Sequence, residues 1–139
     1  VSFALSAKNT NPKKTIVLIS GDGAFLSGGL SIETAFQENL PIVVVIDNNG
    51  GLDCISQQQE RLFSDGSHFA TDFRDIPFHT LFEGMGGYGE LVTHKSEIAA
   101  AVKRAIAIGK PACINVKARG VISPIVAATS DKRDKASIE

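Results

Sequence analysis

Four short segments of the chain have the composition of β-strands, and each is bounded by polar residues, glycine or proline. Two of them, TIVLIS at residues 15–20 and IVVVID at residues 42–47, are continuous apolar runs rich in β-branched side chains. Such runs are typical of strands that are buried on both faces of a sheet. YGELV at residues 88–92 and PACINVKA at residues 111–118 are predicted as the third and fourth strands.

Residues 29–40, between the first two strands, carry apolar residues at helical spacing and are predicted as a helix packed on the sheet. Ser31 is the expected N-cap, and Pro41 is expected to end the helix because proline cannot continue it. The apolar stripe of this helix consists of Leu30, Ile32, Ala35, Phe36 and Leu40.

Residues 95–109 predict the clearest helix of the chain, with Ser96 as its N-cap and Gly109 as its end. Its apolar stripe consists of Ile98, Ala101, Val102, Ala105 and Ile106. Residues 72–87 are predicted to contain a helix with a glycine stop near Gly84. The polar stretch after the second strand is expected to be irregular, with a short helical turn at QQQERLF. The opening VSFALSA has the composition of the end of an apolar helix, and we expect the chain to be part of a longer protein.

Strands that alternate with helices of this length predict an α/β fold, a doubly wound parallel sheet with helices on both faces. We expect residues 1–118 to form this domain and residues 119–139 to form a C-terminal tail. Ligands in such folds bind in the loops at the carboxyl ends of the strands. The first strand ends at Gly-Asp-Gly, residues 21–23, and the second at Asn-Asn-Gly-Gly, residues 48–51. The two motifs are therefore expected to share one site.

The composition of the 139-residue chain is that of a globular domain, with 43% hydrophobic and 21% charged residues. Its net charge of -1 provides no basic surface for nucleic acid. The chain has no apolar run of the roughly 20 residues that a membrane span needs and no secretion signal, so we expect a cytoplasmic protein without membrane contact. Cys54 and Cys113 lack the paired spacing of a zinc or redox site and are expected to be buried thiols.

The two strand-end motifs are weak signals separately, because glycine, aspartate and asparagine are ordinary turn residues. Together they offer a set of hard oxygen ligands, namely the carboxylate of Asp22, the amide oxygen of Asn49 and the backbone carbonyl of Gly51. This set suits Mg²⁺. Gly23 and Ala24 have backbone N–H groups that we expect to be free for phosphate oxygens. The combination predicts a metal–diphosphate anchor.

The same stretch resembles the diphosphate-binding domain of thiamine diphosphate (ThDP)-dependent enzymes. The segments GDG, ETA, ENLPI and VVVIDNN follow one another as they do in that family, and Asn49 follows Asp22 by 27 positions, the family's usual separation. Residues 72–118 resemble the closing half of the family's domain, so that the resemblance covers residues 15–118.

The resemblance implies ThDP and Mg²⁺ as cofactors, with Asp22, Asn49 and Gly51 as the metal ligands. The residues implied to bind the cofactor are Gly21, Asp22, Gly23, Ala24, Phe25, Asn49, Gly51 and Leu52. In that family the glutamate that activates the aminopyrimidine lies in another domain, usually of a neighbouring subunit. The resemblance therefore implies that this chain is inactive alone and works with the remaining N-terminal domains of the same enzyme, as a homodimer or homotetramer.

Within the family, GDGAFLSGG, IET, NLP and NNGG most resemble the 2-hydroxyacyl-CoA lyases and oxalyl-CoA decarboxylases. This implies a ThDP-dependent carbon–carbon lyase or decarboxylase that acts on an acyl-CoA-type substrate, with an acetolactate-synthase-like carboligase as the alternative. An alternative of another class is a non-catalytic, Mg²⁺-binding receiver-like module. Such a module also needs an acidic cluster ahead of its phosphorylated aspartate and a lysine at a late strand end, and neither is evident in the sequence.

Two acidic residues after the metal loop are candidates for substrate-side proton transfer. Glu60, in QQQE, is the first candidate, because the corresponding loop and short helix of the family border the reacting carbon; Asp53 is the second. A surface position is the alternative for Glu60. His68 and Asp72 have i, i+4 spacing and with His79 resemble an iron-binding triad in residue type, but the intervening residues resemble the family's loop.

The tail resembles an active-site lid and is strongly charged. Lys132, Arg133 and Lys135 are expected either to meet coenzyme A phosphates or to form a solvated run of charges.

Overall fold

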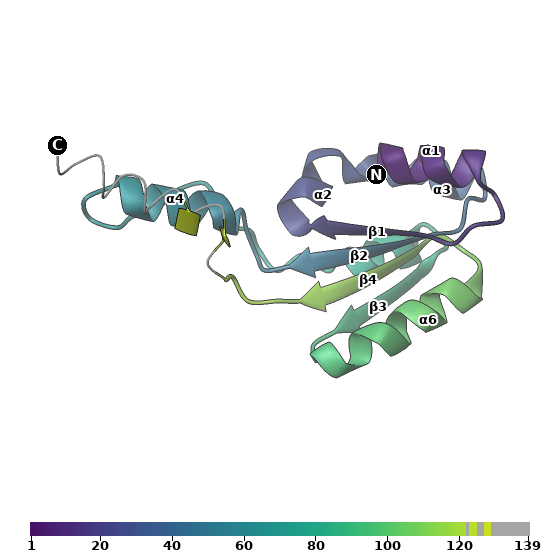
Figure 1. The fold of residues 1–139 in the computed structure, drawn as a ribbon. Helices are drawn as coiled ribbons and strands as arrows, with labels where there is room; N and C mark the ends of the chain where they lie inside the picture. The colour runs from purple at the N-terminus through teal and green to yellow at the C-terminus, as the bar shows by residue number, and fades with distance from the viewer. Residues whose placement is uncertain (122, 125–126, 129–139) are drawn as a thin grey trace.

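The computed structural model describes residues 1–121, 123–124 and 127–128, and the sheet is its central element (Figure 1). Its four strands are β1 Ile16–Gly21, β2 Ile42–Asn48, β3 Tyr88–Val92 and β4 Ala112–Lys117. All neighbouring pairs are parallel, and the strand order is β1-β2-β4-β3. The α/β class and the parallel sheet predicted from the sequence are thus confirmed. The charged tail residues Lys132, Arg133 and Lys135 lie outside the described residues.

Helices cover both faces of the sheet. Figure 1 shows α1, α2 and α3 on one side of the strands and α6 on the other, while α4 extends beyond the carboxyl ends of the strands. The helices and 3-10 turns are α1 Ser2–Thr10, α2 Asp22–Gly28, η1 Gly29–Ile32, α3 Glu33–Gln37, α4 Asp53–Leu62, α5 Phe78–Gly84, η2 Lys95–Glu97 and α6 Ile98–Ile108. Among the residues that the structure describes, no helix has the length and apolarity that a membrane span requires.

The alternation of side chains along β2 divides the core into two clusters. Ile42, Val44 and Ile46 pack with α1, α2, α3 and α5, where Phe82 and its aromatic neighbours fill the interior. Val43 faces the opposite side and packs with the small residues of α6. Because residues of a strand alternate between the two faces, a strand buried on both sides needs apolar residues at successive positions, as residues 42–46 of β2 have.

The edge strand β1 is less completely covered than β2. Its side chains alternate between half-buried and exposed, and Ile19 keeps 76% of its surface exposed. The exposed side chains of β1 lie on the sheet face that α6 covers farther along, at β2, β3 and β4.

The helix predicted at residues 29–40 is broken into η1 and α3, which ends at Gln37, well before Pro41. The chain turns at Asn39, whose φ of 51° is left-handed, and the N–H of Leu40 donates to the carbonyl of Ala35 at 2.8 Å. Ser31 lies inside η1 and donates to the carbonyl of Gly28, so the expected N-cap is wrong. Leu30, expected in the apolar stripe, is 69% exposed.

Two further boundaries differ from those predicted. Helix α5 ends at Gly84, as predicted, but it begins only at Phe78, directly after Pro77, so residues 72–77 are not part of it. The expected helical turn at QQQERLF is instead part of α4, a helix of 10 residues. Residues 73–77 form neither helix nor strand, and Asp72 before them forms a bridge with Gly51 in the loop after β2.

The last helix begins with a 3-10 turn, and Ser96 lies within that turn without capping α6. The predicted end is confirmed, because Gly109 has a left-handed φ of 66° at the C-cap. Ala101 and Ala105 are buried as expected, whereas Ile106 is 40% exposed.

Helix α5 lies very close to β3 at a glycine. A Cβ placed on Gly89 would fall well inside van der Waals contact of the carbonyl oxygen of His79, and also within 2.7 Å of its carbonyl carbon. The absence of a side chain at Gly89 therefore permits the spacing between this helix and this strand.

Candidate functional site

An open pocket of about 320 Å³ lies at the carboxyl ends of β1 and β2. Both strand-end motifs contribute to it, as the parallel sheet predicted. The lining residues are Gly21, Asp22, Gly23, Ala24, Asp47, Asn49, Gly51, Leu52, Asp53, Cys54, Ile55, Arg119, Val121 and Ser123. Every residue implied to bind the cofactor is among them except Phe25, whose side chain is buried in the core against Phe78 and Phe82.

Asp22 joins the two motifs through its carboxylate. It is only 2% exposed. Its Oδ1 accepts the N–H of Gly23 at 2.7 Å. Its Oδ2 accepts the N–H groups of Gly50 and Gly51 at 2.8 and 3.1 Å. One side chain at the end of β1 therefore sets the position of the loop that follows β2.

The loop after β2 is held in a fixed shape by backbone contacts as well. Gly50 has a left-handed φ of 84°, which glycine adopts without strain. Its carbonyl accepts the N–H of Phe73 at 2.7 Å, and the N–H of Leu52 donates to Thr71 at 2.8 Å. A Cβ on Gly51 would lie 2.6 Å from the carbonyl oxygen of Thr71. The loop and residues 71–73 thus form a short two-stranded contact that holds the loop in place.

The two adjacent asparagines have different environments. Asn48 is buried, and its amide donates to the carbonyl of Ile76 at 3.1 Å and to Oδ1 of Asn115 at 3.0 Å. Asn115 is also buried and approaches Nδ1 of His79 at 3.3 Å. Asn49 instead lines the pocket, and its Oδ1 accepts the N–H of Gly51 at 3.2 Å. The second asparagine is therefore the one available to a ligand.

The expected phosphate-binding amides are only partly available. The N–H of Gly23 donates to the carboxylate of Asp22, so it is not free as expected. The side chain of Leu52 packs against Gly23, where a Cβ would clash with Cδ2 of Leu52. Ala24 lines the same pocket and lies in the first turn of α2.

The donor set fits a divalent cation. Asp22, Asn49 and Gly51 line one pocket and belong to one hydrogen-bonded unit. The charged residues of the lining are three aspartates, Asp22, Asp47 and Asp53, and one arginine, Arg119, so the pocket carries an excess of negative charge. Carboxylate, amide and carbonyl oxygens are ligands that Mg²⁺ accepts, and the magnesium ion commonly keeps further positions for water or phosphate.

The two candidates for proton transfer lie in different places on α4. Asp53, at the first turn, lines the pocket and accepts a hydrogen bond from Gln57 at 2.8 Å. Glu60 does not line it: its side chain is 43% exposed and pairs with Nδ1 of His68 at 2.8 Å.

His68 links Glu60 to Asp72, whose two carboxylate oxygens lie 3.2 Å from Nε2. His79 is not part of this group, because it contacts Asn115. Among the described residues, no group of three or more histidines, cysteines or acidic residues is arranged to hold a metal ion. The iron-binding triad considered from residue type is therefore absent from this part of the chain.

The pKa of His68 gives a testable pH dependence. The hydrogen bond to Asp72 raises this pKa above its usual value, and the negative charges of Asp72 and Glu60 raise it further. A raised pKa in the folded state means that the stabilising contribution is fully present below the unfolded pKa of about 6.5 and is lost as pH rises through the folded value. We expect the stability difference between wild type and His68→Gln to be larger at low pH than at high pH.

Thermal unfolding measured between about pH 5.5 and pH 9 checks this expectation. His94→Gln, which replaces an exposed histidine elsewhere, is the control. A stability difference between wild type and His68→Gln that grows as pH rises would contradict this expectation.

The two cysteines differ from each other. Cys113 is fully buried in β4, and burial raises the pKa of its thiol to about 12. Cys54 is half-buried and lines the pocket, so the expectation of a buried thiol is wrong for this residue.

Several lining residues were not singled out from the sequence. They are Asp47, Ile55, Arg119, Val121 and Ser123. Asp47 had a recognisable signal, since it is the last residue of an apolar run directly before the Asn-Asn-Gly-Gly motif. Arg119, Val121 and Ser123 belong to the tail that resembles an active-site lid, but no motif distinguishes them individually, because their place in the pocket depends on contacts with α4.

The fold and the site together define an α/β ligand-binding domain whose site is built at the carboxyl ends of parallel strands. Residues 1–116 match a family model described as "Thiamine pyrophosphate enzyme, C-terminal TPP binding domain", and the chain belongs to this family. Thiamine pyrophosphate, which is ThDP, is accordingly the ligand of the domain. The family also separates the chain from the receiver-like modules considered above.

Individual relatives lie in more than one branch of ThDP enzymes. The chain is 36% identical to the acetolactate synthase large subunit IlvG of Mycobacterium tuberculosis over 82% of its length. It is 28% identical to a 2-hydroxyacyl-CoA lyase of Arabidopsis thaliana over 95%. It spans 21% and 23% of these two relatives, respectively.

A solved structure shows the same fold. The ThDP-dependent 4-hydroxybenzoylformate decarboxylase of Rhodococcus jostii RHA1 superposes with a TM-score of 0.75 at 28% identity, over 86% of this chain and 23% of that one.

Proposed function

We propose that this chain is the cofactor-diphosphate-binding part of a ThDP- and Mg²⁺-dependent carbon–carbon lyase or decarboxylase that acts on 2-hydroxyacyl-CoA or oxalyl-CoA-like substrates. The observation that carries the proposal is that Asp22, Asn49 and Gly51 line one pocket in a family whose ligand is ThDP. The relatives named 2-hydroxyacyl-CoA lyase, which match nearly the whole chain, support the substrate class.

An acetolactate-synthase-like carboligase is the second candidate. It is favoured by the acetolactate synthases, which include the relative at 36% identity. Both reactions use the same cofactor, so they place the same demands on the anchor and differ in the residues that contact the substrate.

In either reaction, the roles of this chain are to bind and to orient. Asp22, Asn49 and Gly51 would hold the metal ion, and the backbone at Ala24 would face the diphosphate. ThDP, when bound, supplies the carbanion-stabilising chemistry of carbon–carbon bond cleavage or formation. The proton-transfer group proposed from this chain is Asp53, because it lines the pocket; Glu60 would have to leave its pair with His68 to reach the same space.

The test is a substrate panel assayed with the complete protein loaded with ThDP and Mg²⁺. A 2-hydroxyacyl-CoA, oxalyl-CoA and pyruvate are supplied separately, and product formation is followed for wild type and Asp53→Asn. We expect turnover of one of the coenzyme A thioesters and a lower kcat in the variant, with ThDP affinity within about threefold of wild type. Turnover of pyruvate alone would select the carboligase. A variant with weaker ThDP binding and unchanged kcat would contradict the role of Asp53.

A further inference from the structure

Gln57 uses both ends of its side-chain amide to hold the residues that follow β4. Its Nε2 donates to the carbonyl of Val121 at 2.7 Å, and its Oε1 accepts the N–H of Ser123 at 3.0 Å. The same Nε2 donates to Oδ2 of Asp53, one turn earlier on α4, at 2.8 Å. The glutamine is therefore fixed on its own helix while it binds a separate segment of backbone.

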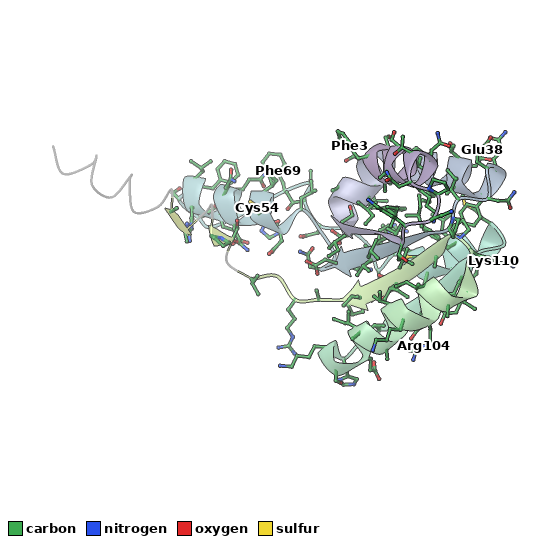
Figure 2. The ribbon with its side chains drawn as sticks, turned by 45° about the vertical axis from the view of Figure 1, so that its right-hand side comes forward. Phe3, Glu38, Cys54, Phe69, Arg104 and Lys110 are labelled. Atoms are coloured by element: carbon green, nitrogen blue, oxygen red, sulfur yellow. The ribbon has the colours of Figure 1, made fainter. Side chains whose placement is uncertain are left out.

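A second contact brings the same two segments together. A Cβ on Gly120 would lie 2.5 Å from Oδ1 of Asp53 and 2.6 Å from Oδ2, so a side chain at this position would displace the carboxylate. We call residues 118–121 and Ser123 the post-β4 strap. Gly120, Val121 and Ser123 of this strap contact the first half of α4. Figure 2 shows the chain continuing from the end of β4 to the helix that carries Cys54.

The post-β4 strap is a wall of the pocket. Arg119, Val121 and Ser123 all line it, together with residues at the carboxyl ends of β1 and β2. Arg119 supplies the positive charge of the lining, beside Asp22, Asp47 and Asp53. It is exposed, and neither a hydrogen bond nor an ion pair holds its guanidinium among the described residues. A cation presented in this way is suited to a ligand that carries anionic oxygens.

We propose that Gln57 is a positioning residue that locks the post-β4 strap onto α4 and so holds Arg119 at the pocket as its anion-binding group. The inference rests on the proposed function for the identity of the anion. That anion is either the cofactor diphosphate or a carboxylate or phosphate of the substrate, and both present the same oxygen chemistry to a guanidinium.

The two neighbouring glutamines have other contacts, since Gln58 lies near Cys54 and Gln59 accepts the N–H of Phe69.

The test uses the complete protein with Gln57→Ala, Arg119→Ala and the double variant, and Gln58→Ala as the matched control. The first measurement is hydrogen exchange at the amide of Ser123, which donates to Gln57. We expect exchange to accelerate at least about tenfold in Gln57→Ala and to stay at the wild-type rate in Gln58→Ala. Gln57→Glu keeps an acceptor for Ser123 and loses the donor to Val121, so an intermediate rate is expected. An unchanged rate in Gln57→Ala would overturn the lock.

The second measurement is binding. Arg119→Ala is expected to raise either the Kd of ThDP with Mg²⁺ or the substrate KM by roughly tenfold, and Gln57→Ala is expected to raise the same one of the two. An increase in the Kd of ThDP with Mg²⁺ identifies the diphosphate as the anion; an increase in the substrate KM at saturating ThDP identifies the substrate. Because Gln57 acts through Arg119, the double variant is expected to be no worse than Arg119→Ala alone.

Effects that multiply in the double variant, or an Arg119→Ala protein with both constants unchanged, would overturn the coupling. Wild-type protein that fails to bind ThDP would overturn the proposed function instead. In that case, the exchange rate of Ser123 still decides whether Gln57 locks the strap.

Discussion

Asp22→Asn is expected to lower the affinity of the complete protein for ThDP with Mg²⁺ by at least about a hundredfold. Mutation of a residue that only hydrogen-bonds to a metal ligand commonly lowers metal affinity about ten- to a hundredfold, and loss of a ligand itself is expected to cost at least as much. The substitution preserves the shape of the side chain but removes its charge. It also replaces one carboxylate oxygen by an NH₂ group. In the native site, both oxygens accept backbone N–H groups, from Gly23 on one side and from Gly50 and Gly51 on the other.

Isothermal titration calorimetry with ThDP in the presence of Mg²⁺ measures this loss directly. Asp47→Asn is the matched control. Asp47 lines the same pocket, and its substitution removes the same charge, but Asp47 is not part of the proposed ligand set. Thermal unfolding of each variant separates loss of the ligand site from loss of the fold. Equal affinity losses in the two variants would show that only the overall charge of the pocket matters and would contradict the anchor role of Asp22.

Gly89→Ala is expected to destabilise the domain by about 3 kcal/mol, because the new methyl group has no space. The Cβ would be forced against the backbone of His79 in α5, and a backbone carbonyl cannot rotate away as a side chain does. Either β3 or α5 has to shift, and the buried phenylalanines of α5 would shift with the helix.

The free energies of hydrogen exchange at the amides of β2 and β4 report the stability of this domain within the complete protein. Gly84→Ala is the control, because Gly84 lies in α5 with open space around its Cα, and alanine there is expected to be neutral or stabilising by up to about 1 kcal/mol. A Gly89→Ala protein whose β4 amides keep wild-type protection would show that the helix and the strand separate at no cost.

The sequence predicted the sheet and the meeting of the two motifs because both follow from local patterns. The apolar runs that became β1 and β2 contain no competing signal, and parallel strands necessarily bring their carboxyl ends to one edge. Asp22 and Asn49 could therefore be placed at one site before any contact between them was known.

Other features of the site depend on the directions of individual side chains, which the sequence pattern does not specify. The N–H of Gly23 was expected to be free, but the carboxylate next to it in the chain takes it. Glu60 had the right residue type for proton transfer, yet its direction depends on His68, which reaches it from the following loop. Gln57 is one of three consecutive glutamines, and only the return of the chain after β4 distinguishes its role from that of Gln58.

The opposite environments of Asn48 and Asn49 have a consequence for insertions and deletions. Removing or adding one residue within β2 would move every later side chain of the strand to the other face of the sheet. A deletion would carry Asn49 into the interior beside Asn115 and bring Gly50 and Gly51 to the end of the strand one step too early to meet Asp22. An insertion would move Asn48 out of the interior and bring the two glycines one step too late. The spacing of this site is therefore as strict in the number of residues as in their identity, so evolutionary changes in length have to fall outside β2 and the turn that follows it.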